Sequence, residues 1–137
     1  MSEEFFISKD KSKLDINLIH KYLSEESYWA KGRLMEDVIK SIENSLCFGV
    51  YNKKQEQIGF ARLVTDQVVF AWIMDVFITN EYRGKGISKK LMDYILQTPE
   101  ITDVNGIGLR TRDAHGLYNK FGFEKIKNTE TWMLKEK

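Results

Sequence analysis

The residues with the clearest chemical potential form a short loop, Arg83-Gly84-Lys85-Gly86-Ile87-Ser88. An apolar, strand-like stretch precedes this loop and a helix-like stretch follows it, so the glycines lie at a predicted helix N-terminus. A helix N-terminus presents unpaired backbone N–H groups and the positive end of the helix dipole. Glycine lets a ligand approach such a backbone closely. The loop therefore predicts a site for a phosphate or pyrophosphate, with a plain helix-starting turn as the alternative.

Two other phosphate-binding motifs do not fit this loop. The dinucleotide-binding fingerprint needs a third glycine at position 89, which is a lysine. The Walker A loop needs four residues between a glycine and Gly-Lys-Ser/Thr, and the sequence lacks that string. The formal net charge is only +1, so the positive charge around the loop is a local feature. Such a balance favours neither nucleic acid nor an anionic membrane as a partner.

Asp75 is the second chemically distinctive residue, because it is the only charged side chain between Val68 and Ile78. Burial among apolar neighbours would raise the pKa of this carboxyl and make it a competent base or an anchor for an amine. The alternative is a carboxylate that pairs with an arginine or with backbone N–H groups. Both interpretations stay open at this point.

The cysteine and histidine content predicts neither a disulfide nor a metal site. Cys47 is the single cysteine and is expected in the core, and the two histidines, His20 and His115, have no partners at ligand spacing. No run approaches the 18 or so apolar residues that a membrane helix needs. The acidic start of the chain is unlike a signal peptide. We therefore expect no metal, no membrane partner and a cytoplasmic location.

The elements that must position these residues follow from hydrophobic periodicity over one domain, residues 1–137. Predicted helices cover Asp15–Tyr22, Leu34–Ile42, Ile87–Leu96 and Ala114–Lys120. Predicted strands cover Phe5–Ile7, Leu46–Tyr51, Gln57–Val64, Val68–Ile78, Gly106–Arg110, Phe123–Lys127 and Thr131–Leu134, the last two as a closing antiparallel pair. Adjacent strands interspersed with helices indicate an α/β or α+β fold with a mixed sheet.

Two segments of this framework resemble the GNAT superfamily of N-acetyltransferases. The loop resembles the family's acetyl-CoA motif, Arg/Gln-x-x-Gly-x-Gly/Ala, with Arg83 and Gly86 in the first and fourth positions and Ser88 in the last. The segment Ala114–Phe123 resembles the family signature Ala-x-x-Leu-Tyr-x-x-x-Gly-Phe, although Thr111 stands where many members have asparagine. The order of elements is similar over nearly the whole chain. The resemblance implies a GNAT-type mixed, mostly antiparallel central sheet flanked by about four helices.

The same resemblance implies roles for individual residues, with acetyl-CoA as co-substrate and an amine as acceptor. Tyr118 takes the position of the family's general acid near the thioester sulfur. Tyr28 and Trp29 lie in the loop that usually shapes the acceptor site, with Asp75 as base or amine anchor, whereas Trp72 is expected in the core. The implied cofactor-binding residues are Phe77 and Ile78 at the end of the fourth strand and Arg83, Gly84, Lys85, Gly86, Ile87 and Ser88 in the loop.

Three functions remain open. The first is acetylation of a primary amine on a small molecule or peptide, by direct attack in a ternary complex. The second is a non-catalytic acyl-CoA-binding sensor or partner module, and the third is a protein-modifying acetyltransferase. The glutamate proposed as base in polyamine acetyltransferases is missing, because Met74-Asp75 stands where those proteins have Glu-Asp. A homodimer is compatible with the family, although no segment marks an interface.

Overall fold

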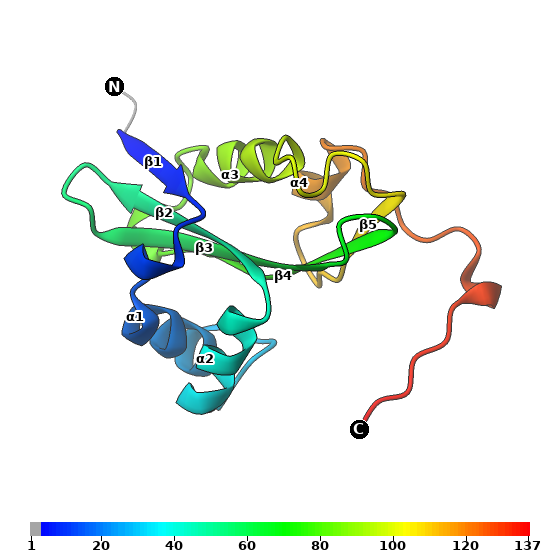
Figure 1. Cartoon of the computed structure of the whole chain (residues 1–137), viewed down its shortest axis with the longest axis horizontal. Helices are drawn as coiled ribbons and strands as arrows, with labels where there is room; N and C mark the ends of the chain where they lie inside the picture. The colour runs from blue at the N-terminus through cyan, green and yellow to red at the C-terminus, as the bar shows by residue number, and fades with distance from the viewer. Residues whose placement is uncertain (1–3) are drawn as a thin grey trace.

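The computed structural model describes residues 4–137, in which a five-stranded sheet carries helices on both faces (Figure 1). The strands are β1 (Phe5–Ser8), β2 (Leu46–Asn52), β3 (Gln57–Thr65), β4 (Phe70–Ile78) and β5 (Gly106–Leu109). The α-helices are α1 (Ile16–Lys21), α2 (Met35–Glu43), α3 (Ile87–Leu96) and α4 (His115–Asn119). A π-helical turn (Tyr22–Glu26) continues α1, and 3-10 turns cover Lys11–Lys13, Asn80–Tyr82 and Thr129–Thr131.

The strands lie in sequence order, β1-β2-β3-β4-β5. The first four pair antiparallel, whereas β5 runs parallel to β4 because α3 crosses between them. A mixed, mostly antiparallel sheet with four α-helices confirms the fold class expected from the sequence. The helix predicted over Ile87–Leu96 has those bounds in the structure, and Pro99 follows its end.

Each face of the sheet buries its own hydrophobic core. One core lies beneath α3 and α4, which Figure 1 shows together on one side of the sheet. Its fully buried members include Phe48, Val50, Ala61, Leu63, Ala71, Leu91 and Ile95. The other core lies beneath α1 and α2 and contains Ile19, Leu23, Val38, Ile42, Cys47, Phe60 and Phe77. Cys47 is 1% exposed, as expected for a core cysteine.

A bulge in β4 reverses the face of the sheet toward which the side chains of the strand point. Phe60 pairs with Phe77 and Arg62 with Met74, so β4 carries one extra residue opposite Ala61. Asp75 lies in this bulge with φ +53°, in the left-handed region that aspartate tolerates better than most residues. Ala71 and Ile73 consequently face the α3 core, whereas Phe77 beyond the bulge faces the α1–α2 core. The bulge thus turns the Asp75 carboxylate toward the α1–α2 side.

The start of β4 differs from the sequence prediction. The strand begins at Phe70 rather than Val68, and Val68 and Val69 are 65% and 54% exposed. The Asp66 carboxylate accepts hydrogen bonds from the N–H groups of Val68, Val69 and Phe70, and so closes a turn in place of the strand.

The predicted closing pair of strands, 123–127 and 131–134, is wrong for the described chain. Neither segment is a strand, and residues 124–137 form an extended, exposed C-terminal tail with one 3-10 turn at Thr129–Thr131. The tail leaves the body beyond α4 and β5 (Figure 1). The N–H and C=O groups of a strand must pair with a neighbouring strand. In the described part of the chain, no strand pairs with residues 124–137.

Candidate functional site

The candidate site lies where β4 and β5 separate. The parallel pairing ends at Ile73 and Leu109, while β4 continues to Ile78 and the chain after β5 turns away. Two strands that part in this way leave a wedge between them, and the wedge opens into a cavity of about 600 Å³. The cavity is lined by Tyr28, Trp29, Arg33, Trp72, Ile73, Met74, Asp75, Val76, Leu109, Arg110, Thr111, Arg112, Asp113, Ala114 and Tyr118.

The glycine loop forms an open N-terminus on α3. Gly86 precedes the helix with φ +79°, and Gly84 has φ +76°. A Cβ atom at either position would meet no other atom within 4 Å, so the backbone of the loop is open to a ligand. These two glycines therefore leave the free N–H groups of the first helical turn accessible to an anion.

The Arg83 side chain turns inward from this loop. Its Nε donates a hydrogen bond to the carbonyl oxygen of Ile78 at 3.1 Å, and its guanidinium donates to the hydroxyl of Tyr22. Tyr22 in turn stacks on Phe77, with ring centroids 4.0 Å apart. Arg83 thus fixes the loop to the end of β4. Because its guanidinium is engaged in these bonds, Arg83 contributes to an anion site through its backbone in the loop rather than through its side chain.

A pair of lysines adds positive charge beside the first turn of α3. The close approach of the Lys89 side chain, together with its charge, lowers the pKa of Lys120. Two ammonium groups this close repel one another, and an anion between them relieves the repulsion. Lys120 was not among the residues expected from the sequence, because it lies at the end of α4, far from the loop in the chain.

The side chains of Phe77 and Ile78 belong to the core, at 4% and 5% exposure. Only their backbone groups are therefore available to a ligand. Beyond Ile73 the edge of β4 that faces β5 has no strand partner in residues 4–137, so its amides are free to pair with an extended, amide-bearing group. The carbonyl oxygen of Ile78 is the exception, because Arg83 already occupies it.

Tyr118 lines the wall of the cavity nearest α4. The residue is 9% exposed and its ring packs edge-on against Phe123 at 5.9 Å. Burial, and secondarily the neighbouring Tyr28, raises the pKa of its phenol. The hydroxyl is therefore fully protonated at neutral pH and can donate a hydrogen bond or a proton into the cavity.

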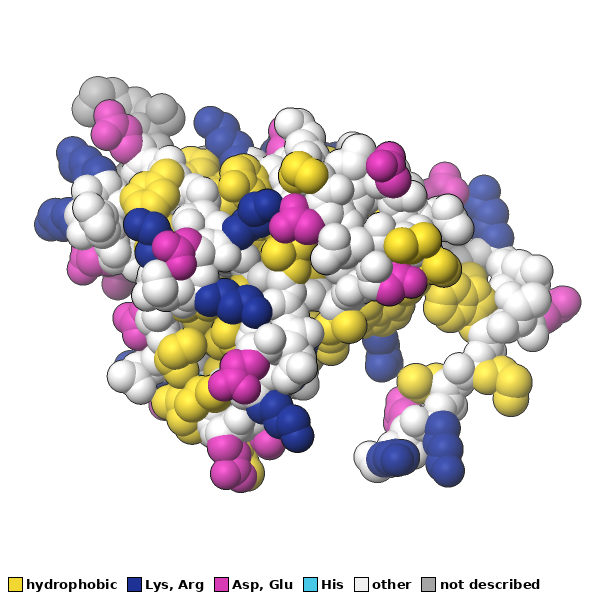
Figure 2. Space-filling model, viewed as in Figure 1, with side chains coloured by type: hydrophobic (Ala, Val, Ile, Leu, Met, Phe, Trp, Pro, Cys, Tyr) yellow, Lys and Arg dark blue, Asp and Glu magenta, His cyan; other side chains and the backbone are white. Residues whose placement is uncertain are grey.

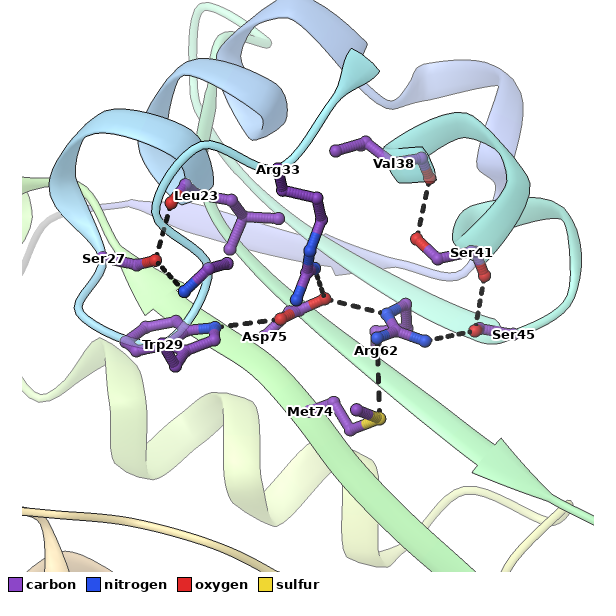
Figure 3. Close-up of polar contacts among 11 residues, drawn as sticks. Leu23, Ser27, Trp29, Arg33, Val38, Ser41, Ser45, Arg62, Met74 and Asp75 are labelled. Atoms are coloured by element: carbon purple, nitrogen blue, oxygen red, sulfur yellow. Dashed lines mark hydrogen bonds and ion pairs between the residues drawn. The ribbon is translucent and has the colours of Figure 1, made fainter. Parts of the chain in front are cut away.

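Asp75 also lines the cavity, where it accepts hydrogen bonds from three donors (Figure 3). Its Oδ1 accepts from Trp29 Nε1 at 2.9 Å, and its Oδ2 accepts from Arg33 at 2.7 Å and Arg62 Nε at 2.9 Å. Burial alone raises the pKa of this carboxyl, but the hydrogen bonds and charges of Arg33 and Arg62 outweigh it and hold the pKa below its ordinary value. The geometry corresponds to the paired carboxylate, the second of the two interpretations above.

The loop that carries Tyr28 and Trp29 is held at both ends. Ser27 donates to the carbonyl of Leu23 and accepts from Ala30 N–H, and these bonds tie the loop to the end of the π-helical turn. At the outer side, the Tyr28 hydroxyl accepts from the N–H of Arg112 at 2.9 Å, and the Arg112 guanidinium stacks 3.8 Å above the Tyr28 ring. The loop thereby bridges to the segment after β5 and forms a wall of the cavity.

Trp72 also lines the cavity and is only partly buried, whereas its position in the apolar run favoured the core. In the described chain, residues 4–137, no group of three or more His, Cys, Asp or Glu side chains is placed to hold a metal ion. None of the helices described is both long and apolar enough to cross a bilayer.

Comparison with known proteins assigns this arrangement to a family. Residues 43–125, which carry β2 to β5, α3 and α4, match the model of the acetyltransferase (GNAT) domain. The chain belongs to the GNAT acetyltransferase family. It is accordingly an acyltransferase, and the family expected from the two sequence motifs is confirmed.

Individual GNAT relatives cover most of the chain. A Xanthomonas campestris pv. campestris crystal structure, assigned to the GNAT family, is 38% identical with a TM-score of 0.95, over 99% of this chain and 95% of that one. An uncharacterised ycf52 N-acetyltransferase of Gracilaria tenuistipitata var. liui is 33% identical over 77% of this chain and 68% of its own length. A Clostridium acetobutylicum acetyltransferase structure with acetyl-CoA shares the GNAT fold at 15% identity and a TM-score of 0.72, over 97% and 96% of the two chains.

Replacing Asp75 with asparagine is expected to destabilise this GNAT domain strongly. Asparagine tolerates the left-handed backbone of the bulge, but Arg33 and Arg62 lose their carboxylate partner, and the Arg62 side chain is only 9% exposed. Removing one member of a buried ion pair costs about 3–5 kcal/mol, which lowers the melting temperature by roughly 6–20 °C for a domain of this size. Thermal denaturation measures the effect. The matched control is Asp113→Asn, since that side chain is 65% exposed, and equal melting of both variants contradicts the expectation.

The same ion pairs give the stability a defined pH dependence. Because the pKa of Asp75 is lowered by folding, its contribution is present above the unfolded pKa of about 3.9 and is lost as pH falls through the folded pKa. We therefore expect the parent protein to lose stability below about pH 4 more steeply than Asp75→Asn does. Parallel acid titrations followed by circular dichroism measure the two slopes, and identical slopes contradict this assignment.

Proposed function

We propose that this GNAT protein is an acetyl-CoA-dependent N-acetyltransferase that acetylates a primary amine of a small molecule or peptide by direct attack in a ternary complex. The observation that carries the proposal is the cavity of about 600 Å³ between the parted strands. The protonated phenol of Tyr118 lines this cavity, and so does the aromatic loop of Tyr28 and Trp29, which Asp75 fixes. A cavity that combines a proton-donating phenol with an aromatic lining suits a two-substrate transfer.

The proposed cofactor end of the site is the N-terminus of α3. The open backbone at Gly84 and Gly86 fits a pyrophosphate, and the adjoining Lys89 and Lys120 fit a further phosphate. The unpaired edge of β4 beyond Ile73 fits the amides of a pantetheine arm. Acetyl-CoA, when bound, supplies an activated acetyl thioester. The related fold solved with acetyl-CoA supports this choice of co-substrate.

Deprotonation of the acceptor amine is the costly part of the reaction. An alkyl amine with a pKa near 10.4 is neutral at pH 7 only at a cost of roughly 4.6 kcal/mol. Asp75 is poorly suited to remove this proton, since its oxygens are occupied by Trp29, Arg33 and Arg62 and its pKa is lowered. We infer that the amine loses its proton to water and that Asp75 is a positioning residue for Trp29 and Arg33.

Tyr118 is the group proposed to move a proton at the sulfur. Its raised pKa keeps the phenol protonated. Full proton transfer from a phenol to a thiolate is uphill by roughly 2 kcal/mol, so the hydroxyl donates a hydrogen bond that strengthens as negative charge develops on sulfur. Tyr28 and Trp29, whose rings meet edge-on at 5.0 Å, provide an aromatic wall for the acceptor.

The proposal is tested with a panel of primary amines, which includes small diamines, amino sugars and peptide N-termini, each incubated with acetyl-CoA. At least one amine is expected to give enzyme-dependent release of free thiol above the rate of acetyl-CoA hydrolysis, with the acetylated amine detected by mass spectrometry. A protein that CoA stabilises in a thermal melt but that acetylates no amine would contradict the proposal and would favour the sensor function.

A further inference from the structure

We infer that the acceptor carries an anionic group, a carboxylate or a phosphate, in addition to its amine, and that Arg110 binds this group. This assignment rests on the acetyl transfer proposed above and narrows its acceptor to one chemical class. The observation behind it is a surplus of positive charge among the side chains that line the cavity.

The buried network at the cavity wall holds more positive than negative charge. Arg33 and Arg62 both donate to the same oxygen of Asp75, Oδ2, at 2.7 and 2.9 Å. Figure 3 shows both guanidinium groups directed at this one carboxylate. Neither arginine has a second carboxylate partner within residues 4–137. One arginine charge in the network therefore has no counterpart.

Arg33 is the member of this pair that reaches the cavity. Its Nη1 donates to Asp75, whereas its Nε and Nη2 have no hydrogen-bond partner in the described chain. The side chains of Arg33 and Arg62 are only 22% and 9% exposed, so water compensates the surplus charge poorly. An anion in the cavity can accept hydrogen bonds from the open donors of Arg33 and neutralise this charge.

Arg110 adds a second charge that has no counterpart. It follows β5 directly and lines the same cavity. Its side chain makes no hydrogen bond, ion pair or ring contact within the part of the chain that the structure describes. Arg112 differs, because its guanidinium stacks on Tyr28 and lies 3.9 Å from the Asp113 carboxylate. The whole guanidinium of Arg110 is thus open to a ligand.

The surplus of positive charge is local to the cavity. The formal net charge of the chain is only +1, and Figure 2 shows basic and acidic side chains interspersed over the face that it draws. The charged side chains that line the cavity are three arginines and two aspartates, and the oxygens of Asp75 are already occupied by three donors. A cleft with an excess of one charge concentrates ligands of the opposite charge.

The proposed cofactor does not account for this charge. Its phosphates are assigned to the N-terminus of α3, and neither the glycine loop nor Lys89 and Lys120 is among the residues that line the cavity. The pantetheine arm carries no charge. The open arginine donors therefore face the acceptor.

The size of the cavity favours a small acidic amine, such as an amino acid or an amino sugar phosphate. A volume of about 600 Å³ is that of a small-molecule site. A planar guanidinium binds a carboxylate or a phosphate through two parallel hydrogen bonds, which fix the orientation of the bound group. Binding of the acidic end at Arg110 thus orients the amine at the other end, whereas a diamine brings a further positive charge to arginines that lack counterparts.

The test compares acceptors that differ in the anionic group. An ω-amino acid is paired with the alkylamine of equal length, and an amino sugar phosphate is paired with the free amino sugar, with a diamine as the cationic case. For the parent protein, the acidic member of at least one pair is expected to have a kcat/KM about tenfold to hundredfold above its partner, the usual effect of a hydrogen bond to a charged group. The pair with the larger preference shows whether the group is a carboxylate or a phosphate.

Arg110→Gln is expected to remove most of this preference by raising the KM for the acidic acceptor about tenfold or more. Arg110→Lys keeps the charge but loses the paired hydrogen bonds, so it should retain part of the preference. The matched control is Lys53→Gln, which removes one positive charge from the turn between β2 and β3, outside the cavity, and should leave the preference intact. Calorimetry with the protein–CoA complex measures the same preference as an affinity and needs no turnover.

Equal kcat/KM and equal affinity within every pair would overturn the assignment, as would a preference that survives Arg110→Gln. Fastest acetylation of a neutral amine or of the diamine would support acetyl transfer and overturn the acidic acceptor. If no amine is acetylated, acetyl transfer fails and calorimetry alone decides. Binding of the acidic compounds to the parent and its loss in Arg110→Gln would then support the anion site, and absence of such binding would overturn it.

Discussion

The Gly86→Asp variant is expected to bind CoA about a hundredfold more weakly than the parent protein. Gly86 lies at φ +79° at the start of α3, with open space where a side chain would begin. A carboxylate there faces the proposed pyrophosphate, and a like charge at about 4 Å costs several kcal/mol at an effective dielectric of about 20, less where water reaches the site. Isothermal titration calorimetry with CoA measures the loss.

Gly86→Asn is the matched control for this variant. Asparagine and aspartate have nearly the same size and both tolerate the left-handed backbone, so the pair isolates the charge. We expect Gly86→Asn to lose less than about tenfold in affinity, from crowding of the loop alone. If Gly86→Asp folds and binds CoA as tightly as Gly86→Asn, the phosphate site lies elsewhere.

The framework of the site could be predicted because it depends on local patterns. The apolar run before the loop, the glycines and the periodicity of Ile87–Leu96 lie within a few residues of one another, and each agrees with the next. The structure reproduces that strand, loop and helix nearly residue by residue. Tyr118 in the cavity wall likewise follows from a contiguous motif.

The electrostatics of the site depend on contacts between residues that lie far apart in the chain, and local sequence patterns do not predict those contacts. Arg62 and Asp75 are each the single charged residue of their strand. That coincidence is a signal for pairing across neighbouring strands, but the bulge that turns Asp75 toward Arg62 has no mark in the sequence. Arg33 and Lys120 reach their positions from distant segments. Whether Asp75 is a base or a paired carboxylate was therefore open until the fold was known.

The tail shows a different limit of sequence patterns. The apolar residues at 132–134 indicate a tendency to form a strand, but they carry no information about which edge supplies the partner. The strand prediction was wrong for the described chain, although the apolar side chains that motivated it remain exposed and in need of burial.

Tyr118→Phe is expected to lower kcat by about a hundredfold while CoA affinity stays within a few fold of the parent. The substitution removes one oxygen from a phenol that lines the cavity and hardly changes its volume. Burial and Tyr28 raise the pKa of this phenol, with no hydrogen bond among the causes, so folding is expected to be little affected by the substitution. Loss of a general acid typically costs about 10²–10⁴ in rate, and a thiolate leaving group places this case at the low end.

Steady-state thiol release with the best amine of the panel measures kcat and KM separately, and calorimetry gives the CoA affinity. Tyr94→Phe is the matched control, because Tyr94 lies on α3, is 39% exposed and packs against Phe48 away from the cavity. Tyr94→Phe likewise removes one phenol oxygen and should leave kcat unchanged. A structural role for Tyr118 would instead raise KM or lower the melting temperature with kcat preserved. Full activity in Tyr118→Phe would mean that the sulfur departs without help from this phenol.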